Sequence, residues 1–329
     1  MKPKLTTRRA AAGLLMLTGF LLQQVGLAQV QAPTGGGAPV ELVVIFPAGS
    51  SADVVARLLA DGMAKQLEQP VLVVNKPGGG GAVGYKYVAA ARPDGRTLVW
   101  NSNSVSTTFH SGAMDIDYKA FEPVARVTIE IPAVVVQATS PWKTLNDLIS
   151  YARANPGLLK VGNSGTGSHT HLGSMTLFEA VGVKVLDVPF SASQVVTSLL
   201  GGHVDALVQL PGAVVPHVKS GALRVLTVLG SKRDPVFADT PTASELGVVM
   251  APMDLWRGIG VPKGTPRPVI ARLEKAIEVS MSRPEFVNAG LKFGFVPAFM
   301  PSEEFGSLVA RDDEVIGRQM QQLGLKKKP

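Results

Sequence analysis

The chain has 329 residues, no cysteine, and 32 basic against 25 acidic residues, which gives a formal net charge of +7. The absence of cysteine excludes thiol nucleophiles, cysteine-ligated zinc, iron–sulfur clusters, disulfides and lipid attachment to an N-terminal cysteine. Four basic residues lie within the first nine positions, which leaves +3 for the rest, and the three lysines 326–328 account for that remainder. Basic stretches interleaved with aromatic residues are missing, so we expect no nucleic-acid partner.

The N-terminus has the pattern of a secretory signal peptide. Its basic start precedes an apolar run, 10–22, that is too short to span a bilayer, and Gly26-Leu27-Ala28 supplies small residues for cleavage. We predict a signal peptide over 1–28 cleaved near Ala28, a flexible lead-in over 29–38, and a free periplasmic protein. An uncleaved membrane anchor is the alternative, and Thr7-Arg8-Arg9 leaves the general and twin-arginine export routes both open.

After the lead-in, short apolar strands alternate with amphipathic helices. Strands are expected at 41–46, 71–75 and 97–100, with helices at 53–68 and 83–91 between them. This β-α-β-α-β order predicts a parallel sheet with helices on both faces. It also brings the loops that follow the strands to the carboxyl edge of the sheet, where ligands bind in such folds.

A second alternating unit begins after the β-branched stretch 124–138. The remaining strands are expected at 159–162, 183–188, 204–210, 223–229 and 254–261, and the remaining helices at 144–155, 169–180, 192–200, 214–220, 268–281, 284–289 and 303–323. About 300 residues remain after the signal peptide, which is more than one hydrophobic core usually serves, so we expect two lobes.

Three of the strands run into loops of small residues and then into helices. These loops are 47–53, 76–84 and 163–169. The first turn of a helix leaves N–H groups without partners, and these groups carry the positive end of the helix dipole. Small residues let an anion approach this backbone, while serine and threonine hydroxyls add donors. The pattern predicts a site for a small, negatively charged ligand.

The third loop is the most informative, because it combines small residues with several hydroxyl groups. A carboxylate there can accept two or three charge-assisted hydrogen bonds. The alternative is that these residues only cap the start of the helix. The same backbone geometry would serve carboxylate binding and capping. In the first loop we expect Ser50 and Ser51 to contact the ligand, although both can cap the helix, and we expect Asp53 to act mainly as an acid in its first turn.

Other kinds of site find little support in the sequence. Residues 79–84 match G-x-G-x-x-G, but no acid follows about 20 residues later to bind a ribose, so a close backbone approach or a flexible turn is expected instead. His169 and His171 lack a third and fourth metal donor, and we predict no metal site and no cofactor. Motifs of nucleophilic, phosphate-binding or metal-dependent enzymes are absent, so no catalytic residue is assigned and an unfamiliar hydrolase remains the alternative.

Taken together, the motifs resemble those of the Bug-type solute receptors, the periplasmic binding components of tripartite tricarboxylate transporters. The resemblance covers about 40–325. The matching segments are Phe46–Arg57, Asn75–Gly81, Pro93–Gly95, Asn155–Gly157, Gly162–Leu172, Val188–Phe190, Leu199–Gly202, Lys219–Arg224, Pro241-Thr242, and Trp256 with Pro262–Pro266.

The resemblance implies an α/β, two-lobed type II periplasmic binding protein, in which each lobe is a doubly wound sheet with flanking helices. Lobe 1 would comprise 39–128 plus 255–329 and lobe 2 would comprise 129–254, with two hinge crossings and a ligand cleft between the lobes. In such receptors one ligand carboxylate lies on the loop that corresponds to Ser164–Ser168, and the first loop, Phe46–Ser51, closes the other side, partly through water.

The ligand-binding residues expected from the loops and from the resemblance are Phe46, Pro47, Gly49, Ser50, Ser51, Ser164, Gly165, Thr166, Gly167, Ser168, Phe190, Ser191 and Gln209. Two positions depart from the family pattern. The family usually has an aromatic residue, a base and a glycine where this chain has Phe190-Ser191-Ala192, and it often has aspartate in place of Gln209. With a cation and an acid lost, a mono-acid, an aromatic acid or a less charged acid becomes a candidate ligand.

We therefore expect a monomeric, non-enzymatic receptor that captures a small organic acid and presents it to the membrane permease subunits of a tripartite transporter. Two alternatives remain open at this point. One is an α/β enzyme that acts on a small organic acid, and the other is a receptor that reports ligand binding only to a signalling partner.

Overall fold

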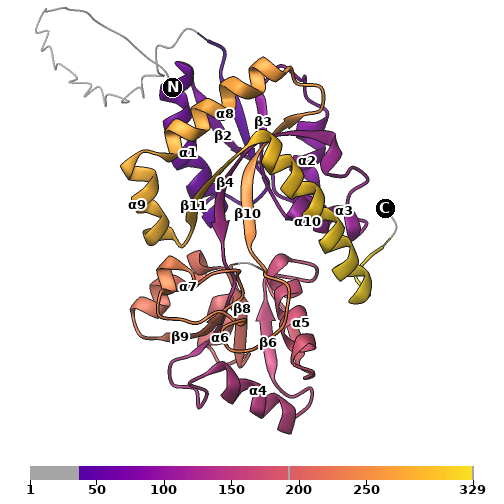
Figure 1. Cartoon of the computed structure of the whole chain (residues 1–329), viewed down its shortest axis with the longest axis vertical. Coiled ribbons are helices and arrows are strands. Elements are labelled where there is room, and N and C mark those ends of the chain that lie inside the picture. The colour runs from indigo at the N-terminus through magenta and orange to yellow at the C-terminus, as the bar shows by residue number, and fades with distance from the viewer. Residues whose placement is uncertain (1–36, 192, 328–329) are drawn as a thin grey trace, which may run out of the picture. The chain divides into compact units, whose positions relative to one another are not determined.

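A computed structural model describes residues 37–191 and 193–327. The predicted signal peptide, its cleavage point, most of the lead-in and Ala192 lie outside the described residues. All described residues belong to one compact unit, which contains two sheets (Figure 1). No described helix is long and apolar enough to cross a membrane.

The first sheet has six strands in the order β11-β4-β10-β3-β1-β2. Its strands are β1 Val40–Val44, β2 Val71–Asn75, β3 Thr97–Ser102, β4 Phe121–Glu130, β10 Leu255–Pro262 and β11 Val296–Pro301. The helices associated with it are α1 Ser51–Leu67, η1 Gly79–Gly81, α2 Ala82–Ala89, α3 Ser104–His110, η2 Tyr118–Ala120, α8 Arg267–Met281, α9 Pro284–Phe293 and α10 Ser302–Gln322.

This sheet is mixed, which corrects the prediction of a parallel sheet. β1 pairs in parallel with β2 and β3, as expected, but β10 runs antiparallel to β3 and β4, and β11 runs antiparallel to β4. The reason lies in the path of the chain. β4 leaves this sheet for the second one, and β10 brings the chain back beside it, with Leu255 paired to Glu130, so the returning strand has the opposite direction.

The second sheet has five strands in the order β7-β6-β8-β5-β9. Its strands are β5 Ala133–Gln137, β6 Lys160–Asn163, β7 Leu186–Pro189, β8 Ala206–Gln209 and β9 Leu223–Val228, and its helices are α4 Leu145–Ala154, α5 His169–Ala180, α6 Val195–Leu200, α7 Pro211–Lys219 and η3 Pro235–Phe237. β6 is parallel to β7 and β8, whereas β5 is antiparallel to β8 and β9.

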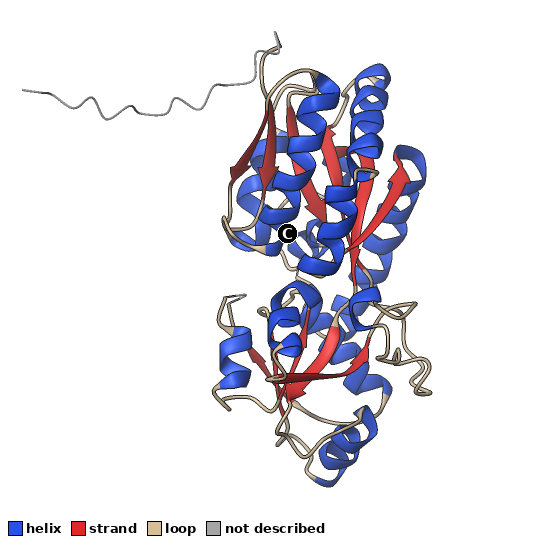
Figure 2. Ribbon diagram, turned by 90° about the vertical axis from the view of Figure 1, so that its left-hand side faces the viewer, coloured by secondary structure: helices blue, strands red, loops and turns tan. Residues whose placement is uncertain are grey.

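Helices lie on both sides of each sheet (Figure 2), because apolar side chains cover both faces. Val55, Leu59 and Met63 recur along α1 at helical spacing and are fully buried against the first sheet. Burying side chains of this size contributes about 1.5–3 kcal/mol each. α10 begins on the first sheet, but its later residues Ile316 and Met320 pack into a core cluster of the second sheet.

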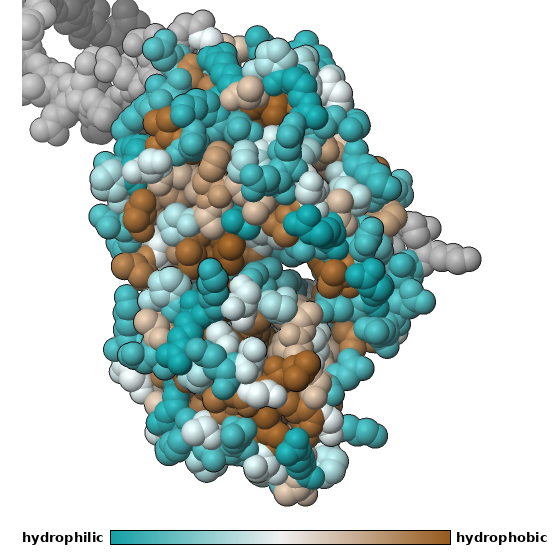
Figure 3. Space-filling model, viewed as in Figure 1, coloured by the Kyte–Doolittle hydropathy of each residue, from teal (hydrophilic) through white to brown (hydrophobic). Residues whose placement is uncertain are grey.

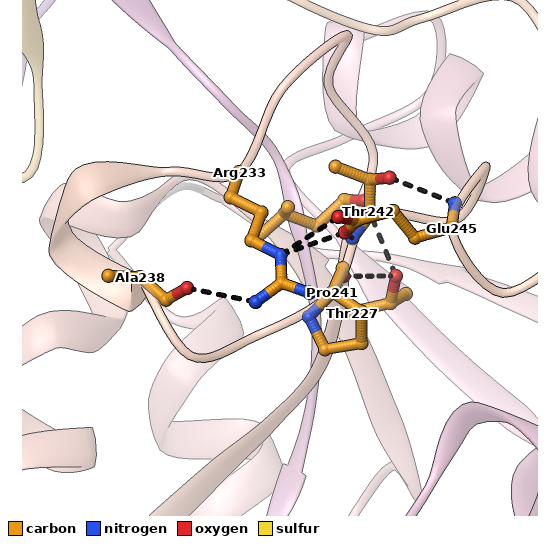
Figure 4. A network of polar contacts seen from close by, with 7 residues as sticks. Thr227, Arg233, Ala238, Pro241, Thr242 and Glu245 are labelled. Carbon is orange, nitrogen blue, oxygen red and sulfur yellow. Dashed lines mark hydrogen bonds and ion pairs between the residues drawn. The ribbon is translucent and has the colours of Figure 1, made fainter.

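The long connection from β9 to β10 is held by polar contacts at its base (Figure 4). Arg233 Nε donates to both carboxylate oxygens of Glu245, at 3.0 and 2.9 Å, and Glu245 also accepts from the Thr242 N–H at 2.8 Å. Thr227 Oγ1 donates to the Pro241 carbonyl at 2.9 Å. Because both ion-pair partners are half exposed, solvent screens the ion pair, and the hydrogen bonds to backbone groups fix the loop.

Candidate functional site

The loop between β6 and α5 folds on itself through hydrogen bonds from its own amides. The Ser164 N–H donates to Thr170 Oγ1 at 2.9 Å, and the Gly167 N–H donates to His171 Nδ1 at 3.0 Å. Ser168 Oγ caps the helix by accepting from the His171 N–H at 3.2 Å. These hydrogen bonds occupy some of the N–H and hydroxyl groups that the sequence pattern assigned to a ligand, and they fix the shape of the loop.

Three amides at this corner have no hydrogen-bond acceptor among the residues that the structure describes. They belong to Thr166, His169 and Thr170, and the last two lie in the first turn of α5. Thr166 is exposed, and the glycines on either side of it have φ values of 110° and 77°, which other residues rarely adopt. Unpaired N–H groups in and just before the first turn of a helix are donors from which a carboxylate can accept.

The loop itself contains no acidic side chain that would neutralise the positive end of the α5 dipole. Burial lowers the pKa of His171, so its ring is neutral and accepts from the Gly167 N–H. Asp187 acts on the His171 ring; it accepts from Ser174 Oγ at 2.8 Å, and burial raises its pKa. The positive end of the α5 dipole is therefore not neutralised within the loop.

The loop between β1 and α1 has a similar backbone but contains an acid. Ser50 caps α1, and the Asp53 carboxylate accepts from the Gly49 N–H at 2.9 Å, from Asn75 Nδ2 at 2.9 Å and from Arg57 Nε at 3.1 Å. Burial alone would raise the pKa of Asp53, but these bonds hold it below its usual value. The contacts give Asp53 a structural role, and Arg57 also forms an ion pair with it, with Nη2 3.0 Å from Oδ1.

The glycine-rich loop is tightly packed, as the predicted close approach of its backbone requires. A Cβ on Gly81 would lie 2.9 Å from Ile45 Cδ1, and Thr108 Oγ1 donates to the Gly80 carbonyl at 2.7 Å. Residues 78–81 all have positive φ. The run of glycines thus lets the chain turn and approach the side chains of Ile45, just after β1, and Thr108 of α3.

The other predicted residues have different surroundings. Gln209 is buried at the end of β8, where its Nε2 donates to Ser164 Oγ at 2.9 Å and its Oε1 accepts from the Leu210 N–H. Phe190 packs partly into the second sheet, and the exposed Ser191 hydroxyl bonds to Gln194. The structure thus joins Gln209 to the third loop and directs Ser191 into a local turn.

The first loop also meets the second sheet's helices. A Cβ on Gly212 of α7 would lie 3.0 Å from Ser51 Oγ and 2.7 Å from the carbonyl oxygen of Phe293 at the end of α9. The Ser51 hydroxyl is buried and has no partner among the described residues. Figure 3 shows a gap in the surface where the two halves of the described chain meet.

Sequence reasoning missed Arg257 and Glu130, which lie on the two strands that connect the sheets. Arg257 Nε donates to Glu130 Oε1, and the two side chains are only 5% and 0% exposed. The Arg257 guanidinium carbon lies 5.4 Å from the centre of the Phe46 ring, in the first loop. A charged residue within the apolar run 255–261 was the available signal, since a base in a fully buried strand needs a partner.

His169 and His171 have separate structural partners. His169 Nε2 lies 2.7 Å from the Met253 carbonyl oxygen, which can only accept, so Nε2 carries the proton. Burial lowers the pKa of His169, which makes Nδ1 an acceptor, and this atom is buried without a partner in the described chain. Within residues 37–191 and 193–327, no group of three or more metal-ligating side chains occurs.

Comparisons with known proteins give consistent matches. The family model described as "Tripartite tricarboxylate transporter family receptor" matches residues 55–325. A UPF0065 protein of Cupriavidus necator is 33% identical over 320 residues, 97% of each chain, and the protein BugT of Bordetella pertussis is 32% identical over 310 residues, 92% of this chain and 94% of BugT.

Solved structures agree in fold. A TctC solute binding protein from Polaromonas superposes with a TM-score of 0.74 at 31% identity, covering 86% of this chain and 98% of that one. MatC of Rhodopseudomonas palustris, solved with malate, gives 0.73 at 27% identity over 85% and 98% of the chains. Another R. palustris protein, solved with adipate, gives 0.79 at 26% over 87% and 97%. These matches confirm the predicted α/β, two-lobed fold.

Proposed function

The chain belongs to the tripartite tricarboxylate transporter receptor family, and from this premise we propose that it captures a small carboxylate-bearing solute in the periplasm. The family consists of periplasmic binding proteins of the type II fold. The observation that carries the proposal is the corner at the start of α5, where the amides of Thr166, His169 and Thr170 have no acceptor among the described residues. The relatives solved with malate and adipate support a carboxylate ligand.

The proposed site lies between lobe 1, residues 39–128 plus 255–329, and lobe 2, residues 129–254. The ligand carboxylate binds at Ser164–Ser168, where Gln209 orients the Ser164 hydroxyl. The first loop, Phe46–Ser51, covers the ligand from lobe 1 through its backbone, its hydroxyls and the Phe46 ring. Phe190 and Ser191 border the site on the β7 side.

Capture proceeds without chemical conversion of the ligand. The solute stabilises the closed arrangement only by its greater affinity for that arrangement. The contact of Gly212 with Ser51 and Phe293 is one place where closure brings the lobes together. The closed, monomeric receptor then delivers its ligand to the membrane permease subunits of a tripartite transporter, after export with a signal peptide that is cleaved near Ala28.

A thermal-shift screen of mono-, di- and tricarboxylates tests the proposal, because a ligand that binds only the folded state raises its apparent stability. At 100 times its Kd a ligand adds about 2.7 kcal/mol. The bound compound, recovered unchanged after long incubation, separates a receptor from an enzyme. A protein that no carboxylate stabilises would contradict the proposal.

A matched pair of variants then locates the site. Thr166 is exposed, so Thr166→Glu and Thr166→Gln should both fold normally. The glutamate places a negative charge beside the three amides and should weaken binding at least about tenfold, as a nearby like charge does at a partly exposed site. The glutamine should change affinity little. Equal affinities of the two variants, measured by calorimetry, would remove this corner from the site.

A further inference from the structure

In the ion pair between the two connecting strands, each residue has a polar atom without a hydrogen-bond partner. Arg257 Nη1 and Glu130 Oε2 are buried and have no hydrogen-bond partner among the described residues. Thr128, which lies opposite Arg257 in the register of β4 and β10, has an unpaired buried Oγ1 as well. Buried polar groups are normally paired, so several unused ones in one place indicate a bound partner.

The polar groups around Tyr85 of α2 and the end of β3 are paired with one another. Tyr85 is fully buried, and its hydroxyl donates to Asn101 Oδ1 at 3.0 Å and lies 2.9 Å from Ser104 Oγ. Ser104 Oγ in turn lies 2.7 Å from Ser102 Oγ. These groups satisfy one another. Trp100 Nε1 on β3 is a further buried donor without a partner among the described residues, but Arg257 differs from it in having an unpaired carboxylate oxygen of Glu130 and an unpaired hydroxyl of Thr128 on the paired strand.

His169 connects Arg257 to the carboxylate corner. Its backbone N–H is one of the three unpaired amides, and its ring reaches the Met253 carbonyl just before β10. The charges of Asp254, Arg257 and Glu130 all act on this ring. The Arg257 guanidinium carbon also lies 5.4 Å from the centre of the Phe46 ring. Arg257 therefore lies close to the first loop and acts electrostatically on a residue of the third loop.

The charges around this position decide what kind of group can bind there. Arg257 is the single base among the three charged residues that act on His169, and Glu130 already neutralises it by direct contact. A second ligand carboxylate would add an uncompensated negative charge beside Glu130, which is unfavourable in a buried site. An uncharged oxygen can accept from Nη1 without this penalty.

On the basis of the proposed function, we propose that Arg257 is a second ligand-binding residue, whose Nη1 donates to an uncharged carbonyl or hydroxyl oxygen at the ligand end opposite the carboxylate. Glu130 is a positioning residue that orients the guanidinium and keeps this end of the site neutral. The receptor thus selects acids with one carboxylate and one uncharged polar end, such as monoamides or hydroxy acids.

The test uses ligands that differ only at the far end. Calorimetry compares the four-, five- and six-carbon diacids with their monoamides and with the unbranched alkanoates of equal length. At one or more of these lengths, we expect the wild-type protein to bind the monoamide at least tenfold tighter than both the diacid and the alkanoate. A diacid that binds as tightly as its monoamide at every length would overturn the inference and leave the proposed function intact.

Variants assign the preference to the residue. Arg257→Gln alone leaves Glu130 buried without its partner and can fail to fold, so the main variant is Arg257→Gln with Glu130→Gln, which replaces the ion pair by two amides. It should bind alkanoates like the wild type and lose the tenfold gain for the monoamide. Arg224→Gln is the control, because Arg224 Nη1 bonds to the Trp142 carbonyl on the second sheet. Retention of the full preference in the double variant would overturn the inference, whereas failure of every carboxylate to bind the wild type would reject the proposed function itself.

Discussion

The loops that follow β1 and β6 are built alike, but they differ in one side chain. In each, a glycine precedes a serine that caps the helix, and the third helical residue reaches back to accept the glycine N–H. That residue is Asp53 for Gly49 in the first loop and His171 for Gly167 in the third. The acceptor in the first loop is therefore a carboxylate that is paired with Arg57, whereas the acceptor in the third loop is a neutral ring.

This difference shows that a strand, a loop of small residues and a helix do not make an anion site by themselves. The dipole of α1 is already matched by the Asp53 carboxylate, so a ligand anion would meet a like charge there. The dipole of α5 has no such partner. Family resemblance placed a carboxylate on the third loop, and the identity of the third helical residue gives a physical reason for that choice.

The largest effect is expected when the third loop is given the acid of the first. In His171→Asp the new carboxylate can still accept from the Gly167 N–H, so the helix should remain capped and folded. A like charge about 5 Å from the ligand carboxylate costs about 3 kcal/mol at an effective dielectric constant near 20, which is about a hundredfold in Kd.

The matched control for that change is His171→Asn, which is neutral and should bind within a few-fold of the wild type. Calorimetry with any carboxylate found in the thermal-shift screen measures both variants. Comparable affinity of the aspartate and asparagine variants would show that the corner does not bind an anion.

The reciprocal change, Asp53→Asn, should act on stability. It removes charge-assisted bonds to Gly49, Arg57 and Asn75, and we expect the free energy of unfolding to fall by about 1.5–3 kcal/mol at pH 7. Because the folded-state pKa of Asp53 lies below its ordinary value of 3.8, the unfolded chain binds more protons, and the contribution is present above about pH 4 and lost as the pH falls through the folded pKa.

Urea denaturation across this pH range checks both statements about Asp53. The difference in unfolding free energy between wild type and Asp53→Asn should shrink toward acid pH. A difference that stays constant down to the lowest accessible pH would mean that the carboxylate is not the stabilising form.

Substitution of the two capping serines should have a smaller effect, but it distinguishes the first loop from the third. Ser50→Ala and Ser168→Ala each remove an N-cap acceptor, for which we expect a loss of about 1 kcal/mol in unfolding free energy. Only Ser168 caps the helix whose free amides we assign to the carboxylate, so Ser168→Ala should weaken ligand binding more. Affinity that falls more in Ser50→Ala would transfer the carboxylate to the first loop.

Sequence periodicity predicted most elements of both sheets, because strands such as β1, β5 and β8 are short, apolar and flanked by turn residues. It missed α3 and β11, since Ser104–His110 is rich in residues with low helix propensity and Val296–Pro301 contains two prolines. The direction of β10 depends on the chain returning from the other sheet, which no local pattern encodes.

The candidate site was predictable only in part. The residues of the third loop could be selected from their composition. Its internal hydrogen bonds could not be predicted, because Thr170 and His171 of the helix accept from backbone N–H groups of the loop that precedes it. Arg257 and Glu130 are 127 positions apart and come together only through strand pairing. Long-range contacts of this kind leave no spacing in the sequence.

The smallest effect is predicted for His169, whose ring links the third loop to the residues just before the return strand β10. Burial lowers its pKa below the ordinary value of 6.5, and the backbone bond to Met253 and the charges of Asp254, Glu130 and Arg257 modify that shift. The unfolded chain therefore binds the proton more readily, and stability should decline as the pH falls below about 6.5. His171 contributes in the same direction, since burial also lowers its pKa.

The two contributions are separated by His169→Gln and His171→Gln, followed by urea denaturation from about pH 7.5 to about pH 5. Each variant should flatten part of the decline in unfolding free energy. A pH profile of stability that is unchanged in His169→Gln would show that the His169 ring does not have the lowered pKa that its burial implies.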